Sequence, residues 1–243
     1  MELVDAHASG ACGGNSVEVR VFFRAPYHLI GEKLKEQIKN RKLKKSSREW
    51  LRRQLDDPFV AKAKKEGYRS RAAFKILEIQ DKFKIFNKNS IVIDLGAAPG
   101  GWSQVISQIV QKIIAIDLLE MDPIPNVDFI KGDFTDELNM KKLEELLPDK
   151  KADVVMSDMA PNTCGIKKVD HLRIMGLLEI VYDFCKNILN PGGTMIAKVF
   201  RGRAENEFLN ELKKHFSKII HFKPNSSRKE SPEIYIIAMG YRH

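Results

Sequence analysis

Four ionisable residues stand in stretches that are otherwise apolar, which makes them the first candidates for chemistry. They are Lys75, Asp158, Lys198 and Glu233. A buried lysine or carboxylate loses the hydration that stabilises its charge, so it needs a charged partner or a role in a site. Lys198 interrupts the run MIAKVF, and the plain alternative is a lysine whose chain reaches solvent from the end of a strand.

The apolar runs around these residues predict an α/β fold. From residue 91 onward, short apolar runs alternate with amphipathic stretches, as in parallel strands that are buried on both faces and separated by helices. The loop PNSSRKESP holds no helix, so the last strand is expected to run antiparallel. We predict a mostly parallel, doubly wound, seven-stranded sheet with one antiparallel strand. The predicted strands are residues 91–95, 112–117, 127–131, 152–157, 194–200, 218–223 and 233–239, and the predicted helices are residues 102–111, 136–147, 171–189 and 204–216.

The first predicted strand runs into a glycine-rich turn, GAAPGG, at residues 96–101. Ligands of open α/β sheets bind beyond the carboxyl ends of the strands, and glycine lets the backbone approach them closely. The turn lacks the GxGxxG pattern of a dinucleotide site and could by itself be only a tight loop. The residues that follow the neighbouring strands must therefore indicate the ligand.

Aspartates stand at or just after the ends of four predicted strands, namely Asp94, Asp117, Asp133 and Asp158. Asp117 is placed to accept hydrogen bonds from both hydroxyls of a ribose, and Asp133 from an adenine amino group. NAD and S-adenosylmethionine both contain adenosine, but an acidic rim suits a sulfonium cation better than an anionic pyrophosphate. Each aspartate alone could also be a helix cap.

The formal net charge of +9 over 243 residues favours a polyanionic partner, with nucleic acid as the first expectation and an anionic membrane surface as the second. No apolar run approaches the roughly 20 residues of a membrane span. We see no targeting signal and expect a cytoplasmic protein. Cys12, Cys164 and Cys185 are too scattered for a disulfide framework or a zinc site, and we expect no metal.

Lysines and arginines are concentrated between residues 32 and 53, where a solvated helix face is the plain interpretation. Residues 56–86 show apolar residues at helical spacing, with Gly67 as a break between two predicted helices. We divide the chain into an N-terminal extension of unassigned role at 1–40, a basic helical segment at 41–86 and the α/β domain at 87–243.

Several motifs occur together and in a fixed order: DLGAAPGGWSQ, DLLEMDP, GDFTDE, SDMAPN, GGTMIAKVF and SSRKESPEIY. From Ser46 to the end, the chain resembles the RrmJ/FtsJ family of ribose 2′-O-methyltransferases, and most closely its bacterial ribosomal-RNA branch. The resemblance implies a Rossmann-like, class I S-adenosylmethionine-dependent methyltransferase fold. It also implies a catalytic Lys-Asp-Lys-Glu tetrad, whose positions match the four residues named first.

The same resemblance implies that the methyl donor lies against the glycine-rich turn, with Asp117 on its ribose and Asp133 at its adenine. The candidate cofactor-binding residues are Asp94, Gly96, Pro99, Gly100, Gly101, Trp102, Asp117, Leu118, Asp133, Phe134 and Asp158. Two features depart from the family pattern: the extension at residues 1–40, and a short connection, WSQVISQIVQKIIAID, between the turn and the second strand.

A ribose 2′-hydroxyl is a weak nucleophile at neutral pH, so its proton must leave as the oxygen attacks the sulfonium methyl group. Lys198 is the candidate for accepting this proton or for stabilising the developing alkoxide, and the sequence leaves the two roles open. Asp158 would orient the lysines, Lys75 would hold the hydroxyl electrostatically, and Glu233 would position the ribose or a lysine.

Basic residues beside a ribose-methylating site have phosphates to contact, so we interpret residues 41–71 as RNA-binding. The candidates are Arg41, Lys42, Lys44, Lys45, Arg48, Arg52, Arg53, Arg69 and Arg71. The resemblance implies, as substrate, a uridine ribose in the A-loop of 23S-type large-subunit ribosomal RNA, methylated on the assembled or nearly assembled large subunit. Nothing in the sequence calls for more than a monomer.

Other functions stay open. A transfer-RNA or cap ribose methyltransferase of the same fold would use the same tetrad, although SDMAPN and SSRKESPEIY are closest to the ribosomal branch. A non-catalytic ribosome assembly factor would not need an intact tetrad. A nicotinamide oxidoreductase would bind NAD but would leave Lys198 and Asp133 without an explanation.

Overall fold

The computed structural model describes residues 52, 55–161, 166–200 and 205–242. The chain divides into two compact units, Met1–Glu66 and Gly67–His243. In the first unit the structure describes one complete helix, α3 (Pro58–Glu66), on which Lys62 pairs with Glu66 at 3.8 Å. Residues 41–51, 53 and 54 of the basic helical segment and all of residues 1–40 lie outside the described residues.

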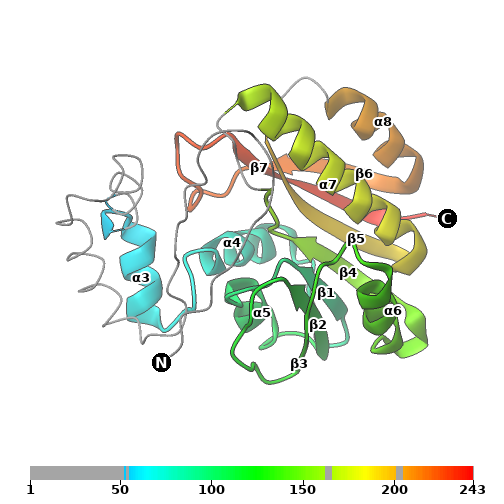
Figure 1. Cartoon of the computed structure of the whole chain (residues 1–243), viewed down its shortest axis with the longest axis horizontal. Coiled ribbons are helices and arrows are strands. Elements are labelled where there is room, and N and C mark those ends of the chain that lie inside the picture. The colour runs from blue at the N-terminus through cyan, green and yellow to red at the C-terminus, as the bar shows by residue number, and fades with distance from the viewer. Residues whose placement is uncertain (1–51, 53–54, 162–165, 201–204, 243) are drawn as a thin grey trace. The chain divides into compact units, whose positions relative to one another are not determined.

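The second unit is built on a seven-stranded sheet with the order β3-β2-β1-β4-β5-β7-β6 (Figure 1). The strands are β1 (Ile91–Leu95), β2 (Lys112–Asp117), β3 (Val127–Lys131), β4 (Ala152–Ser157), β5 (Leu189–Phe200), β6 (Phe216–Phe222) and β7 (Glu233–Tyr241). β7 runs antiparallel to both β5 and β6, and the other neighbouring strands pair in parallel. This confirms the predicted mostly parallel sheet with one reversed strand.

Helices cover both faces of the sheet, because the buried strands present apolar side chains in both directions. On β1, Val92 packs in one core with Ile76 and Ile106, whereas the next residue, Ile93, packs in the other with Leu178 and Leu212. α4 and α5 therefore cover one face, and α6, α7 and α8 the other (Figure 1). The helices are α4 (Ala73–Phe83), α5 (Gly101–Ile106), α6 (Glu137–Glu145), α7 (Lys167–Ile188) and α8 (Glu205–His215), with a short 3-10 helix, η1 (Pro148–Lys150), before β4.

The strand register brings distant parts of the sequence to one edge of the sheet. Ser157, the last residue of β4, pairs with Ala197 of β5, so Asp158 emerges beside Lys198. Phe200 at the end of β5 pairs with Glu233 at the start of β7. Asp158, Lys198 and Glu233 are far apart in the sequence, and the pairing of β4, β5 and β7 makes them neighbours.

Two elements, α5 and β5, differ most in length from those that the sequence predicts. α5 ends at Ile106 rather than at residue 111, because the chain turns after Ser107 and buries Val110 on its way into β2. β5 begins at Leu189 rather than at residue 194, since Leu189 already pairs with Ala152 across a register shift. No helix in the described ranges is long and apolar enough to cross a membrane.

Candidate active site

The four ionisable residues singled out from the sequence form one cluster at the edge of the sheet. Lys75 Nζ lies 2.8 Å from Glu233 Oε1 and 3.5 Å from Asp158 Oδ1, and Lys198 Nζ lies 3.1 Å from Asp158 Oδ1. The side chains come from α4, from the end of β4, from β5 and from the start of β7. Two ammonium groups and two carboxylates therefore share one confined site, with Asp158 between the lysines.

Asp158 is the electrostatic centre of this cluster. Burial alone would raise the pKa of its carboxyl group, but the charges of Lys198 and Lys75 and a hydrogen bond from Tyr235 lower the pKa to about 2. Lys198 also donates a hydrogen bond to the backbone carbonyl of Asp158. The carboxylate is thus ionised at neutral pH and holds both lysine ammonium groups beside it.

Tyr235 is a member of the cluster that the sequence analysis missed. Its hydroxyl donates to Asp158 Oδ1 at 2.6 Å and accepts from Lys75 Nζ at 2.9 Å. Burial, reinforced by the nearby carboxylates, raises its pKa well above the ordinary value, so the phenol keeps its proton. The available signal was its position two residues after Glu233, since alternate residues of a strand share a face of the sheet.

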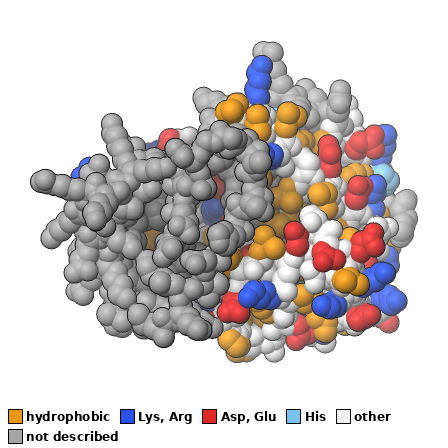
Figure 2. All heavy atoms as spheres, viewed as in Figure 1, with side chains coloured by type: hydrophobic (Ala, Val, Ile, Leu, Met, Phe, Trp, Pro, Cys, Tyr) orange, Lys and Arg blue, Asp and Glu red, His pale blue; other side chains and the backbone are white. Residues whose placement is uncertain are grey.

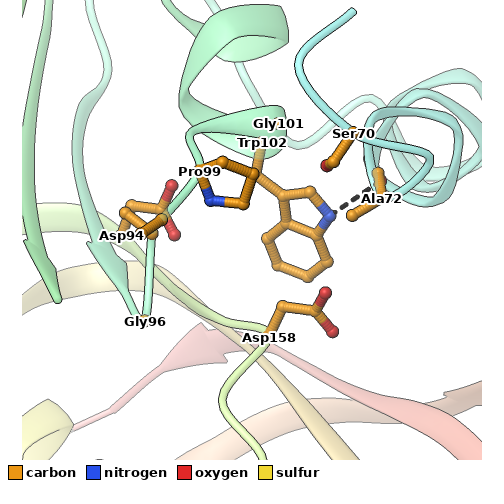
Figure 3. A pocket seen from close by; sticks show the side chains of 10 residues that line it. Ser70, Ala72, Asp94, Gly96, Pro99, Gly101, Trp102 and Asp158 are labelled. Atoms are coloured by element: carbon orange, nitrogen blue, oxygen red, sulfur yellow. Dashed lines mark hydrogen bonds between the residues drawn. The ribbon is translucent and has the colours of Figure 1, made fainter. Parts of the chain in front are cut away.

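A cavity beside the tetrad is lined by the glycine-rich turn and by residues just before α4. The lining residues are Ser70, Ala72, Asp94, Gly96, Ala97, Ala98, Pro99, Gly101, Trp102 and Asp158. Figure 3 shows the indole of Trp102 between the turn and Asp158, with its Nε1 donating to the carbonyl of Ala72 at 2.9 Å. The cavity and the tetrad thus share Asp158.

The glycines of the turn leave no space for side chains. A Cβ atom on Gly96 would lie 2.3 Å from Met159 Cγ, and one on Gly101 would lie 2.1 Å from Ser70 Oγ. Gly100 has φ of +97° and faces Met121, and it is not among the residues that line the cavity. Gly96, like Gly100, has a positive φ (+76°), which L side chains rarely adopt.

Asp94 is the second carboxylate of the cavity and is almost fully buried. Burial raises the pKa of its carboxyl group to about 7, and the charges of Asp158 and Asp117 act in the same direction. Ser103 Oγ donates to Asp94 Oδ2 at 2.6 Å, which opposes the rise without cancelling it. A positively charged ligand in the cavity would favour the ionised form of this group.

Asp117 and Leu118, two further cofactor candidates, lie outside the lining of this cavity. The Asp117 carboxylate accepts the backbone N–H groups of Ala98 at 2.9 Å and Leu119 at 2.8 Å, so it ties the end of β2 to the glycine-rich turn. Burial nevertheless raises the pKa of Asp117. The Leu118 side chain is 65% exposed.

The structure separates the last two cofactor candidates, which are consecutive in sequence. Asp133 is exposed, and its Oδ1 accepts from the backbone N–H and the hydroxyl of Thr135, both at 2.8 Å. The Phe134 ring instead packs edge-on against Phe184 in the core between the sheet and α7, with the ring centroids 5.2 Å apart. Neither residue lines the cavity.

Three of the RNA-binding candidates fall within the described residues. Arg52 is exposed. Arg69 donates to the carbonyls of Asp122 at 2.6 Å and Pro123 at 2.8 Å, and Arg71 donates to the carbonyl of Ser226, so both guanidinium groups hold loops of the protein. On the visible face in Figure 2, lysine, arginine and carboxylate side chains are interspersed where residues are coloured. The candidates outside the described residues are Arg41, Lys42, Lys44, Lys45, Arg48 and Arg53.

Comparison with known proteins gives consistent matches over most of the chain. Residues 68–241 match the family model of FtsJ-like methyltransferases. The chain is 55% identical over 207 residues to "Ribosomal RNA large subunit methyltransferase E" of Rickettsia bellii, covering 80% of this chain and 89% of that protein. It is 53% identical over 203 residues to the protein of the same name from Acidiphilium cryptum, covering 83% and 90%.

A solved structure gives a similar result. A crystal structure described as that of a ribosomal RNA methyltransferase from Plasmodium falciparum matches with a TM-score of 0.65 and 37% sequence identity. The match covers 72% of this chain and 98% of that chain. The family model spans the sheet, the glycine-rich turn and all four residues of the charged cluster. The chain therefore belongs to the family of FtsJ-like methyltransferases, as its motifs predicted.

Proposed function

We propose that this methyltransferase transfers a methyl group from S-adenosylmethionine to the 2′-hydroxyl of a uridine ribose in the A-loop of large-subunit ribosomal RNA. The proposed substrate form is the assembled or nearly assembled large subunit. The observation that carries the proposal is the charged cluster of Lys75, Asp158, Lys198 and Glu233 directly beside a glycine-walled cavity. The names of the bacterial relatives support large-subunit ribosomal RNA as the substrate class.

S-adenosylmethionine is the methyl donor of the family, and the residues of the cavity fit it. Ser70 Oγ is buried there and has no hydrogen-bond partner in the described part of the chain, so it is available to a polar group of a ligand. Asp94 and Asp158 supply the negative charge that suits a sulfonium cation, and Trp102 supplies an apolar wall. When bound, the cofactor supplies a methyl group on a positively charged sulfur, which a nucleophilic oxygen can displace.

The cluster would activate the ribose hydroxyl for this attack. Lys198 is assigned to the proton of the 2′-hydroxyl, because its Nζ lies closer to Asp158 Oδ1 (3.1 Å) than Lys75 Nζ does (3.5 Å), and Asp158 lines the cavity. Lys198 would accept this proton in its amine form, as the oxygen attacks the methyl group. Asp158 orients Lys198 and offsets its charge. Lys75, held by Glu233 and Tyr235, would stabilise negative charge that develops on the oxygen. Holding the reacting atoms in line would supply much of the acceleration.

The lysines and arginines between residues 41 and 53 would bind phosphates of the RNA, and the exposed side chain of Arg52 is available for this. Arg69 and Arg71 already hold loops beside the site, so their contribution to RNA binding would include fixing the surface on which the RNA lies. An extended polyanion bound by many cations predicts an affinity that falls steeply with salt concentration.

The experiment measures methyl transfer from labelled S-adenosylmethionine to unmethylated large subunits, naked ribosomal RNA and transfer RNA. We expect label on the subunits with the wild-type protein and none with Lys198→Ala. The matched control is Lys112→Ala, which removes a strand lysine paired with Asp128 at 3.1 Å at the start of β2, away from the cavity. Label on transfer RNA alone would show that transfer RNA is the substrate instead of the large subunit. Cofactor binding without label on any of the three RNAs would support a ribosome assembly factor.

A further inference from the structure

One stripe of side chains on α4 and the residues before it faces the β6–β7 loop, which we define as residues 223–232. The stripe consists of Arg71, Lys75, Glu78 and Lys82, whose spacing of four, three and four places them on one helix face. At one end of the stripe, Lys82 Nζ lies 4.7 Å from the ring centroid of Phe222, the last residue of β6. Nearer the other end, Lys75 contacts Glu233, the first residue of β7. The stripe therefore spans the loop from one strand to the other.

Glu78 fixes the backbone in the middle of this loop. Its carboxylate accepts the N–H of Asn225 at 2.6 Å with one oxygen and the N–H of Ser226 at 2.8 Å with the other. Arg71 donates to the carbonyl of the same Ser226. Lys223 Nζ donates to the carbonyl of Ser231 at 2.7 Å and so ties the two ends of the loop together. The position of the next residue, Ser227, follows from these contacts.

Ser227 connects the loop to the charged cluster. Its side chain is buried, and its Oγ donates to Glu233 Oε1 at 2.9 Å. The same carboxylate oxygen lies 2.8 Å from Lys75 Nζ. An oxygen that accepts from two fixed donors is held in both position and orientation. The hydroxyl of Ser227 thus selects the rotamer in which Glu233 faces Lys75.

We propose that Ser227 and Glu78 are positioning residues for the methyl-transfer step. Glu78 sets the β6–β7 loop against α4, and the loop presents Ser227 Oγ to Glu233, which keeps Glu233 aligned with Lys75. This inference rests on the proposed function of the cluster. None of Glu78, Ser227 and Glu233 lines the cofactor cavity, so loss of this alignment is expected to slow methyl transfer without weakening cofactor binding.

The first test compares Ser227→Ala with Ser226→Ala. Ser226 is the matched control, because it is also buried and its Oγ has no hydrogen-bond partner among the described residues. We expect Ser227→Ala to lower kcat by about 10-fold with an unchanged KM for S-adenosylmethionine, and Ser226→Ala to leave both close to wild type. Ser227→Thr retains a hydroxyl and is expected to restore most of the rate.

The second test asks whether Glu78 acts through Ser227. We expect Glu78→Ala to lower kcat to a similar extent, and the double variant to be little slower than either single variant, because both changes interrupt one chain of contacts. Thermal unfolding of each variant accompanies the kinetics. Equal rates for Ser227→Ala and Ser226→Ala would overturn the inference, as would a loss that Ser227→Thr does not restore. Absence of methyl transfer by the wild-type protein would instead overturn the proposed function.

Discussion

Asp94 and Asp158 occupy corresponding places in the fold but differ in their electrostatic surroundings. Asp94 is the last residue but one of β1, and Asp158 directly follows the neighbouring parallel strand β4. Both are largely withdrawn from solvent, and both line the same cavity. The pKa of Asp94 is raised to about 7, whereas that of Asp158 is lowered to about 2. Asp94 has a serine hydroxyl as its side-chain donor, while Asp158 lies between two lysines.

The difference shows that the neighbours of a buried carboxylate, rather than its depth, decide its charge. Desolvation is the largest influence on the pKa of both groups and raises it in both. Only at Asp158 do two positive charges reverse the outcome. The site therefore has one carboxylate that is ionised at neutral pH, beside the proposed methyl-transfer residues, and one that a cationic ligand can ionise.

The largest expected effect is an opposite pH dependence of stability at the two residues. The folded pKa of Asp94 lies above its unfolded value of 3.8, so its contribution to stability is lost as pH rises from about 4 to about 7, by roughly 4 kcal/mol. The folded pKa of Asp158 lies below that value, so its contribution, about 2 kcal/mol, is lost as pH falls from about 4 towards 2. Urea unfolding of wild type and of Asp94→Asn across this range measures the difference. Parallel curves for the two proteins would contradict the assignment at Asp94.

The next effect separates the two aspartates by substitution. Asp158→Asn leaves the ammonium groups of Lys75 and Lys198 without the carboxylate between them, which should lower the free energy of unfolding by about 3 kcal/mol near neutral pH. Asp94→Asn should not lower it above pH 7, because ionised Asp94 is itself unfavourable there. Denaturant titrations of both variants at one pH just above 7 test this contrast. Equal destabilisation of the two variants would contradict it.

A glycine substitution tests whether the glycine-rich turn binds the cofactor. In Gly96→Ala the new methyl group would meet Met159 at 2.3 Å beside the cavity, so we expect cofactor affinity to fall by about 100-fold. Gly192→Ala is the control, because Gly192 has a similar positive φ but nothing within 4 Å of an added Cβ. Calorimetric titration with S-adenosylmethionine measures both. Similar affinities in the two variants would show that the turn does not bind the cofactor.

The smallest of these effects concerns Tyr235. Removing its hydroxyl in Tyr235→Phe takes one hydrogen bond from Asp158 and one acceptor from Lys75, but leaves both ion pairs of Asp158 in place. We expect kcat to fall by about 10-fold or less, with the KM for the cofactor unchanged. Steady-state kinetics on large subunits provide the measurement. A loss as large as that of a tetrad residue would give Tyr235 a direct part in the reaction.

The sequence predicted the strands well because each is an apolar run between turn residues, and β1 to β4 begin and end at the predicted positions. It also identified the four charged residues, since each interrupts an apolar context. It missed Tyr235 and Ser227, because a tyrosine in a strand and a serine in a loop look ordinary. Only the β5–β7 register places Tyr235 beside Lys198, and only the contacts of the β6–β7 loop place Ser227 beside Glu233. The sequence made both Asp133 and Phe134 cofactor candidates. Packing separates them, because Phe134 lies in the core against Phe184 and Asp133 is exposed beside Thr135.

If the charged cluster activates a ribose hydroxyl, the new methyl group must lie on the 2′-oxygen of that ribose. Unmethylated large subunits would be treated with wild-type protein or Lys198→Ala, and the RNA digested to nucleosides and analysed by mass spectrometry. We expect 2′-O-methyluridine with the wild-type protein and a loss of about 1000-fold or more in its rate of formation with the variant. A methyl group on a base, or 2′-O-methylation that persists in Lys198→Ala, would contradict it.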